Sequence, residues 1–176
     1  MVKTGEPDAK TSPKGMGIVM RKEKQTVDLF SSCLREIQIS YCNRVRYSDM
    51  PKISSSKDAE SIFRSIWSHR MGYVEEFYVL LLNRSNKVIG WSKFSMGGMN
   101  GTVADPKAIF QVALKANASH IIIANNHPSG NLEPSQADIA LTQKMKESGN
   151  FLDLPILDHL ILSTESYYSF ADDGKL

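Results

Sequence analysis

Ile121-Ile122-Ile123-Ala124-Asn125-Asn126-His127-Pro128-Ser129-Gly130 is the stretch that decides the fold of this chain. The apolar run over residues 121–124 predicts a buried strand, and the Pro-Ser-Gly after His127 predicts the turn that ends it. Because side chains alternate along a strand, positions 125 and 127 face the same way and could bind one ion together. A neutral imidazole is a common zinc ligand, so His127 is the first candidate site residue.

Ser135 and Asp138 follow in Pro134-Ser135-Gln136-Ala137-Asp138, directly before an apolar helical pattern. Ser-x-x-Asp at this place is typical of a capping box, in which the carboxylate also benefits from the helix N-terminal dipole. We therefore predict a helix that starts at Ser135, with Ile139 and Met145 on its apolar side and Gly149 at its end.

The other elements follow from apolar periodicity, caps and turn residues. Asp105 as N-cap and Pro106 as first helical residue predict another helix start. We expect a disordered leader over 1–25, a short helix and linker over 26–52, and a compact domain over 53–176. In the compact domain we predict helix 59–69 after the capping box Ser55-x-x-Asp58, strands 77–82 and 88–96, the helix from Pro106, strand 121–124, the helix from Ser135, strand 154–162 and a last short strand 167–171. This alternation predicts an α/β fold, with a sheet flanked by helices.

Composition limits the classes of function. With 176 residues and 41% hydrophobic residues, the chain can bury one ordinary core. A net charge of +2, from 21 basic and 19 acidic residues, gives no large field for a polyanion, so we do not expect direct nucleic-acid binding. Cys33 and Cys42 form no CxxC pair and are interpreted as reduced thiols. The absence of a signal-like or membrane-spanning apolar run leads us to expect a cytoplasmic protein without membrane attachment.

The motifs resemble a known family of metalloproteases. The JAMM (MPN-type) pattern consists of a distant Glu, His-x-His, seven residues, Ser, two residues and Asp, and the span from about Ile53 to Leu176 is similar to the RadC family. The resemblance implies a mixed sheet in an MPN fold, which is JAB-like and cytidine-deaminase-like. Its matching segments are Glu75-Glu76-Phe77, Gly97-Gly98, Asn126-His127-Pro128-Ser129-Gly130, Pro134-Ser135 with Asp138, Leu157-Asp158-His159 and Tyr168-Ser169-Phe170.

The resemblance also implies an activity, which is zinc-dependent hydrolysis of a peptide or isopeptide bond in a protein or peptide substrate. Positions 125, 127 and 138 correspond to the metal ligands, so Asn125, His127 and Asp138 are the expected metal residues. Glu75 is the expected general base, with Glu76 as the alternative, and Ser135 is expected to stabilise an oxyanion. RadC relatives read His-Asn-His-Pro-Ser-Gly, whereas this chain reads Asn-Asn-His-Pro-Ser-Gly.

Asn125 should weaken zinc binding, because an amide oxygen is a poorer zinc ligand than an imidazole. His120 is a poor substitute, since it lies on the opposite strand face and roughly 16 Å back along the strand. His159, in Leu157-Asp158-His159, is interpreted as part of an inward polar pair at the end of a separate strand.

Three functions remain open at this point. The first is an impaired zinc hydrolase, and the second is a non-catalytic MPN interaction module. The family's traditional label suggests a third, an accessory factor in DNA repair or mobile-element functions. A zinc nucleoside deaminase is excluded, since its His-x-Glu and Pro-Cys-x-x-Cys motifs are absent.

Overall fold

The computed structural model describes residues 45–96 and 104–176. The expected leader over 1–25, the expected short helix and linker up to residue 44, and the segment 97–103 with Gly97-Gly98 lie outside the described residues. Within the described part, a 3-10 turn, η2 (Tyr47–Asp49), precedes three helices and five strands. The helices are α1 (Ser56–Ile66), α2 (Pro106–Lys115) and α3 (Gln136–Phe151), and the strands are β1 (Glu76–Leu82), β2 (Val88–Met96), β3 (His120–Asn126), β4 (Ile156–Leu162) and β5 (Tyr167–Ser169).

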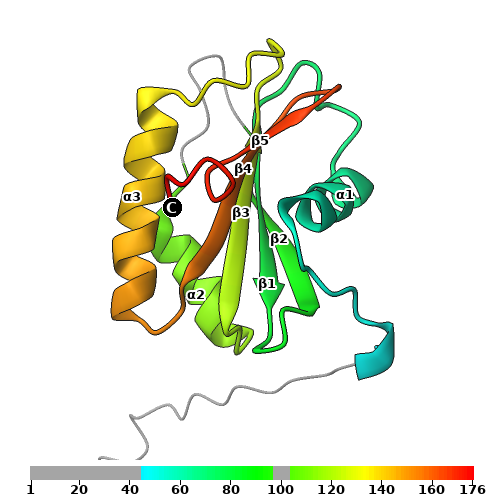
Figure 1. Cartoon of the computed structure of the whole chain (residues 1–176), viewed down its shortest axis with the longest axis vertical. Coiled ribbons are helices and arrows are strands. Elements are labelled where there is room, and N and C mark those ends of the chain that lie inside the picture. Colours follow the sequence, from blue (N-terminus) through cyan, green and yellow to red (C-terminus); the bar gives the residue numbers. More distant parts are fainter. Residues whose placement is uncertain (1–44, 97–103) are drawn as a thin grey trace, which may run out of the picture. The chain divides into compact units, whose positions relative to one another are not determined.

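The five strands form one mixed sheet in the order β2-β1-β3-β4-β5. β3 and β4 are parallel, and every other neighbouring pair is antiparallel. Helix α1 covers one face of the sheet, whereas α2 and α3 cover the other (Figure 1). This arrangement confirms the predicted α/β fold and agrees with a JAB/MPN-like architecture.

The core divides into two layers because β1 is buried on both faces. Phe77, Val79 and Leu81 pack with α2 and α3, in a layer that includes Ile109, Ile123 and Met145. Tyr78, Leu80 and Leu82 pack against α1, in a layer that includes Phe63, Ile122 and Leu160. The uninterrupted apolar run of the sequence is therefore explained by a strand with no solvent-facing side.

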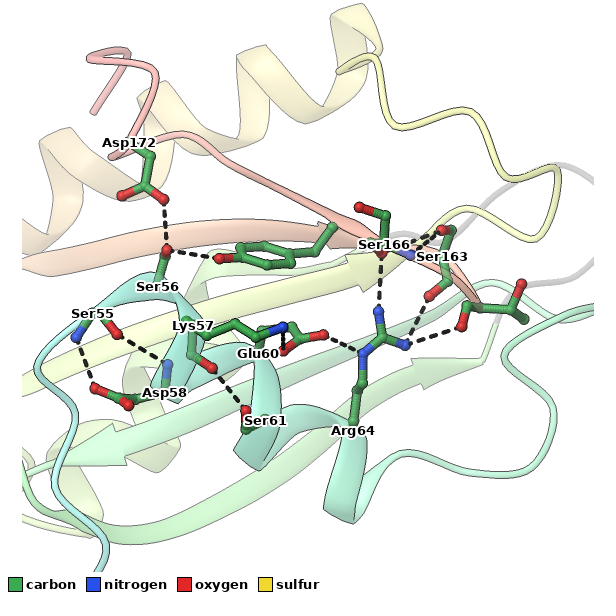
Figure 2. A network of polar contacts seen from close by, with 12 residues as sticks. Ser55, Ser56, Lys57, Asp58, Glu60, Ser61, Arg64, Ser163, Ser166 and Asp172 are labelled. Atoms are coloured by element: carbon green, nitrogen blue, oxygen red, sulfur yellow. Dashed lines mark hydrogen bonds and ion pairs between the residues drawn. The ribbon is translucent and has the colours of Figure 1, made fainter.

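Arg64 connects α1 to the turn between β4 and β5 (Figure 2). Its side chain forms an ion pair with the buried Glu60. Its guanidinium also donates to the carbonyl oxygens of Ser163 at 3.0 Å and Ser166 at 3.1 Å. One planar group with several donors thus fixes the position of α1 relative to the sheet.

Two details of the predicted helices are wrong. The first helix ends at Ile66 rather than at residue 69, because Trp67 adopts an extended backbone and packs its ring 4.3 Å from that of Tyr78. In α3, Ile139 is 41% exposed. The buried side of α3 consists instead of Asp138, Thr142, Met145 and Gly149. The capping boxes at Ser55 and Ser135 are confirmed, as is the Asp105–Pro106 start of α2.

Across residues 45–96 and 104–176, no helix combines the length and the apolar character that a bilayer crossing requires.

Candidate functional site

The candidate site lies where β3 ends, β1 begins and α3 begins, all at one end of the sheet (Figure 1). Asn125 is the last but one residue of β3, and His127 follows the strand. His127 is held there by its backbone, which donates to the carbonyl oxygen of Leu162 at 2.8 Å. The turn after it requires Gly130, which has a φ of 81°.

Asp138 is the residue on which the site converges. The amide nitrogen Nδ2 of Asn125 donates to its Oδ1 at 3.1 Å, and Nε2 of His127 lies 3.4 Å from its Oδ2. Strand alternation thus brings positions 125 and 127 to the two oxygens of one carboxylate. The structure therefore brings the three expected metal residues together.

Ser135 belongs to the same contact network as N-cap of α3. Its hydroxyl lies 2.5 Å from Oδ2 of Asp138, and it accepts from the backbone N–H of Asp138 at 3.1 Å. The backbone N–H of Ser135 donates to Oδ2 at 2.8 Å. Ser135 is therefore committed to the capping box in this state, and a role toward an oxyanion requires its hydroxyl to turn away from Asp138.

The charges at the site are coupled. Burial opposes ionisation of Asp138, but hydrogen bonds from His127 and Ser135 outweigh it and lower the pKa of Asp138 to about 2. The hydrogen bond to Asp138 raises the pKa of His127 above its ordinary value, although burial opposes this, and the nearby charge of Glu75 adds to the increase. Asp138 is thus a carboxylate, which only accepts hydrogen bonds.

The two candidate bases lie on different sides of the sheet. Phe77 of β1 pairs with Asn125 of β3, and continuing this antiparallel register by two residues places Glu75 level with His127. Glu75 is half-buried there, and its charge raises the pKa of His127. Glu76 is fully buried and binds Ser68 and Lys93. The geometry therefore favours Glu75 over Glu76.

Asn126 was not singled out from the sequence, yet it fixes the segment that carries Glu75. Its Nδ2 donates to the carbonyl oxygens of Met71 at 2.6 Å and Val74 at 2.9 Å. Its Oδ1 accepts from the backbone N–H of Glu76 at 2.7 Å. An asparagine beside a candidate ligand thus extends the sheet pairing with its side chain and holds the start of β1.

His159 and Thr142 also belong to the site. The sequence analysis interpreted His159 only as part of an inward polar pair and did not single out Thr142. Nε2 of His159 lies 2.8 Å from Oδ1 of Asn125, and its Nδ1 lies 2.6 Å from the Thr142 hydroxyl. His159 is fully buried and stacks on Phe170 with ring centroids 4.9 Å apart. Burial lowers the pKa of His159 to about 4, so its imidazole is neutral near pH 7.

The sequence contained a signal for Thr142, whereas the place of His159 follows from the strand pairing. Thr142 lies four residues after Asp138 and therefore on the same helix face. His159 pairs with Ile123 in the parallel β3–β4 register, so it shares a face with position 125. Asp158 faces away, where it accepts from Ser169 at 2.6 Å and from the backbone of Ala171 at 3.0 Å.

The donor set only partly fits a zinc ion. Nδ1 of His127 is 2.7 Å from the carbonyl oxygen of Asn131, which is the second contact that orients a ligand histidine and leaves Nε2 for the metal. Asp138 supplies an ionised oxygen. Asn125, however, presents its NH2 group to Asp138 and directs its oxygen to His159, so the third position offers a hydrogen-bond donor. Among the residues that the structure describes, no three His, Cys, Asp or Glu side chains form a metal-binding group.

Comparison with known proteins identifies the family of this chain. Residues 53–175 match the family described as RadC-like JAB domain. The chain belongs to the RadC-like JAB domain family. It is 48% identical to the UPF0758 protein of Flavobacterium johnsoniae over 125 residues. The aligned stretch covers 71% of this chain and 54% of that protein.

Two further relatives extend the comparison. The UPF0758 protein of Porphyromonas gingivalis is 40% identical over 135 residues, covering 76% of this chain and 60% of that protein. The UPF0758 protein of Staphylococcus carnosus is 37% identical over 123 residues, covering 70% and 54%. The chain therefore spans little more than half the length of these relatives.

Proposed function

We propose that this chain is an impaired RadC-like hydrolase domain, which keeps the framework for cleaving a peptide or isopeptide bond but binds zinc weakly and turns over slowly or not at all. The observation that carries the proposal is the side chain of Asn125. A catalytic zinc takes three protein ligands and leaves a fourth position open. His127 and Asp138 suit two of these positions, whereas Asn125 directs an N–H group toward Asp138 and not a lone pair.

The rest of the framework supports an impaired hydrolase rather than an unrelated site. Glu75 lies on the same side of the sheet as His127, and its charge raises the pKa of His127. This position is expected of a general base near the reacting centre. Asn126 holds the backbone before Glu76, and Asn131 orients His127. These contacts support the proposal of a hydrolase framework that lacks one metal ligand.

A test of the proposal measures hydrolysis in the native chain and in Asn125→His, using a fluorescence-quenched library that contains peptide and lysine isopeptide bonds, with zinc added. We expect slow or no turnover from the native chain and faster turnover from Asn125→His. Adding Glu75→Gln to that variant should abolish turnover without loss of zinc, because a general base moves protons and does not bind the metal. Glu147→Gln, at an exposed position of α3, is the matched control. Equal turnover of the native chain and Asn125→His would contradict the proposal.

A non-catalytic interaction module is the second candidate, and one observation favours it. A groove of about 900 Å³ lies between α2 and α3, lined by apolar side chains that include Phe110, Leu114 and Phe151. Phe151 is 89% exposed. The groove uses the C-terminal half of α3, whereas Asp138 lies in the first turn. If the module is the working part, Phe151→Asp should abolish complementation of a deletion strain while His127→Ala should not.

A further inference from the structure

The helices α2 and α3, which cover the same face of the sheet (Figure 1), form a groove on their outer side. The buried Phe110 belongs to its floor, and Leu114, Phe151 and Leu152 add apolar side chains to its lining. Phe151 is 89% exposed and Leu114 is 51% exposed. A largely uncovered aromatic ring beside an apolar groove is typical of a surface that binds another molecule.

The charged groups of the groove lining carry both signs. Lys107 and Lys144 supply two ammonium groups, and Asp105 and Glu147 supply two carboxylates. Across the part of the chain that the structure describes, none of these four groups forms an ion pair. The lining has no net charge, so it favours neither a strongly acidic nor a strongly basic partner. A surface with both signs in equal number is instead complementary to a rotated copy of itself.

The groove side of α3 has a spacing that suits pairing with a second α3. Residues three or four apart share one side of a helix, and this side presents Lys144, Glu147, Ser148 and Phe151. A two-fold axis beside Ser148 brings two such sides together in antiparallel directions, with Lys144 of one copy facing Phe151 of the other. The small side chain of Ser148 allows the two helices to approach closely at the axis.

We propose that a second copy of this chain occupies the groove, in a two-fold dimer in which each Phe151 inserts into the groove of the other copy. Both grooves are filled at once, because an isologous interface repeats every contact in reverse. Phe151 then packs against Phe110 and Leu114 of the other copy. Lys144 of that copy covers the ring with its aliphatic stem, and its ammonium group lies within about one helical turn of Glu147.

The dimer leaves the candidate site open. Asp138 lies in the first turn of α3, and Phe151 is the last residue of this helix. At about 1.5 Å per residue, the two are roughly 20 Å apart along the helix axis. The inference is therefore independent of zinc and of the hydrolase assignment. It rests on the second candidate function only in taking the groove as a binding surface, and it names the occupant.

Sedimentation velocity of the full native chain, from micromolar to millimolar concentration, tests the dimer. We expect a dimer that dissociates on dilution, because each copy contributes only one groove and one side of a helix. Phe151→Asp should weaken dimerisation about 100-fold or more, since each copy loses a ring that the dimer buries. Asn150→Asp, with the same new charge at the exposed preceding position, is the matched control. A native chain that stays monomeric at millimolar concentration would overturn the proposal, as would equal dimerisation of the two variants.

Charged residues at position 148 test the two-fold geometry. A side chain beside the axis meets its own copy, so Ser148→Lys and Ser148→Glu should each dimerise poorly by like-charge repulsion. An equimolar mixture of the two should form heterodimers about tenfold more strongly than either variant pairs with itself. Unchanged melting temperatures show that both variants are folded. Folded variants that associate no more strongly when mixed would overturn the proposal.

The dimer and the second candidate function can fail separately. If the native chain dimerises through Phe151 but Phe151→Asp still complements a deletion strain, the dimer stands and the interaction module fails. If the native chain is monomeric while Phe151→Asp loses complementation, the groove binds a different protein and the dimer is overturned.

Discussion

The side-chain oxygen of Asn125 lies 2.8 Å from Nε2 of His159, so the amide at the expected ligand position is itself held by an imidazole from the neighbouring strand. Its nitrogen is held by Asp138 at 3.1 Å. Both ends of the amide therefore have partners although it is 2% exposed, and the cost of burying an unsatisfied polar group is avoided. Asn125 is consequently compatible with a stable fold, and under the proposed function it leaves the metal site one ligand short.

Acid should destabilise the fold through His159. Its folded pKa of about 4 lies below its ordinary value of 6.5, so the unfolded chain takes up the proton first as pH falls. Stability is then lost between pH 6.5 and 4, by at most about 3 kcal/mol. Urea unfolding at pH 7 and pH 4.5 should show this loss in the native chain and a smaller one in His159→Gln.

Other groups at the site titrate outside this window or with the opposite sign. The raised pKa of His127 contributes stability at low pH that is lost as pH rises through the raised value. The contribution of Asp138 is present above 3.8 and is lost only as pH falls toward about 2. Burial raises the pKa of Asp158. We expect its contribution to be the same in the native chain and in His159→Gln, so it should cancel in the comparison. Identical pH profiles for the native chain and His159→Gln would show that His159 is not buried in its neutral form.

Arg64→Ala should destabilise the fold by about 2–4 kcal/mol, because it leaves the buried Glu60 without its main partner and the carbonyl oxygens of Ser163 and Ser166 without donors. Lys57→Ala is the matched control. Lys57 also pairs with Glu60, but its side chain is 68% exposed, so its removal should cost less than about 1 kcal/mol. Equal losses in chemical denaturation would contradict the role assigned to Arg64.

Gly149→Ala should destabilise α3 even though alanine is the better helix former by about 1 kcal/mol. A Cβ at position 149 would lie 2.7 Å from the backbone carbonyl oxygen of Leu154, and backbone atoms cannot move aside as a flexible side chain can. The melting temperature should fall by several degrees, on the order of 2–4 °C per kcal/mol for a chain of this size. Asn150→Ala, at the exposed next position, should leave it unchanged or raise it.

Local signals in the sequence predict most of the fold. The capping boxes at Ser55 and Ser135 act within a few residues and were located correctly, as was the strand over residues 88–96. The end of α1 was wrong because it depends on the packing of Trp67 against Tyr78 of β1, a tertiary contact with the following strand. Ile139 was wrongly assigned to the core because the polar residues Asp138 and Thr142 occupy the buried side of α3.

The residues of the candidate site also fall into two groups, those that local sequence signals predict and those that depend on the whole sheet. Alternation along one strand predicts that positions 125 and 127 share a face, and helix spacing relates Ser135 to Asp138. The contacts of His159 could not be predicted, because they require knowledge of which strand lies beside β3. The order β1-β3-β4 is a property of the whole sheet, and it is this order that places an imidazole behind Asn125.

Zinc affinity of the metal-free native chain and of Asn125→His, measured side by side by competition with a chelator of known affinity, tests most directly the claim that Asn125 disables the third ligand position. We expect the native chain to bind zinc at least 10–100-fold more weakly than Asn125→His, since loss of a ligand nitrogen should cost no less than loss of a partner behind it. Asp138→Ala in the Asn125→His background should lose the metal. One tightly held zinc per native chain, with an affinity that Asn125→His does not improve, would contradict the account.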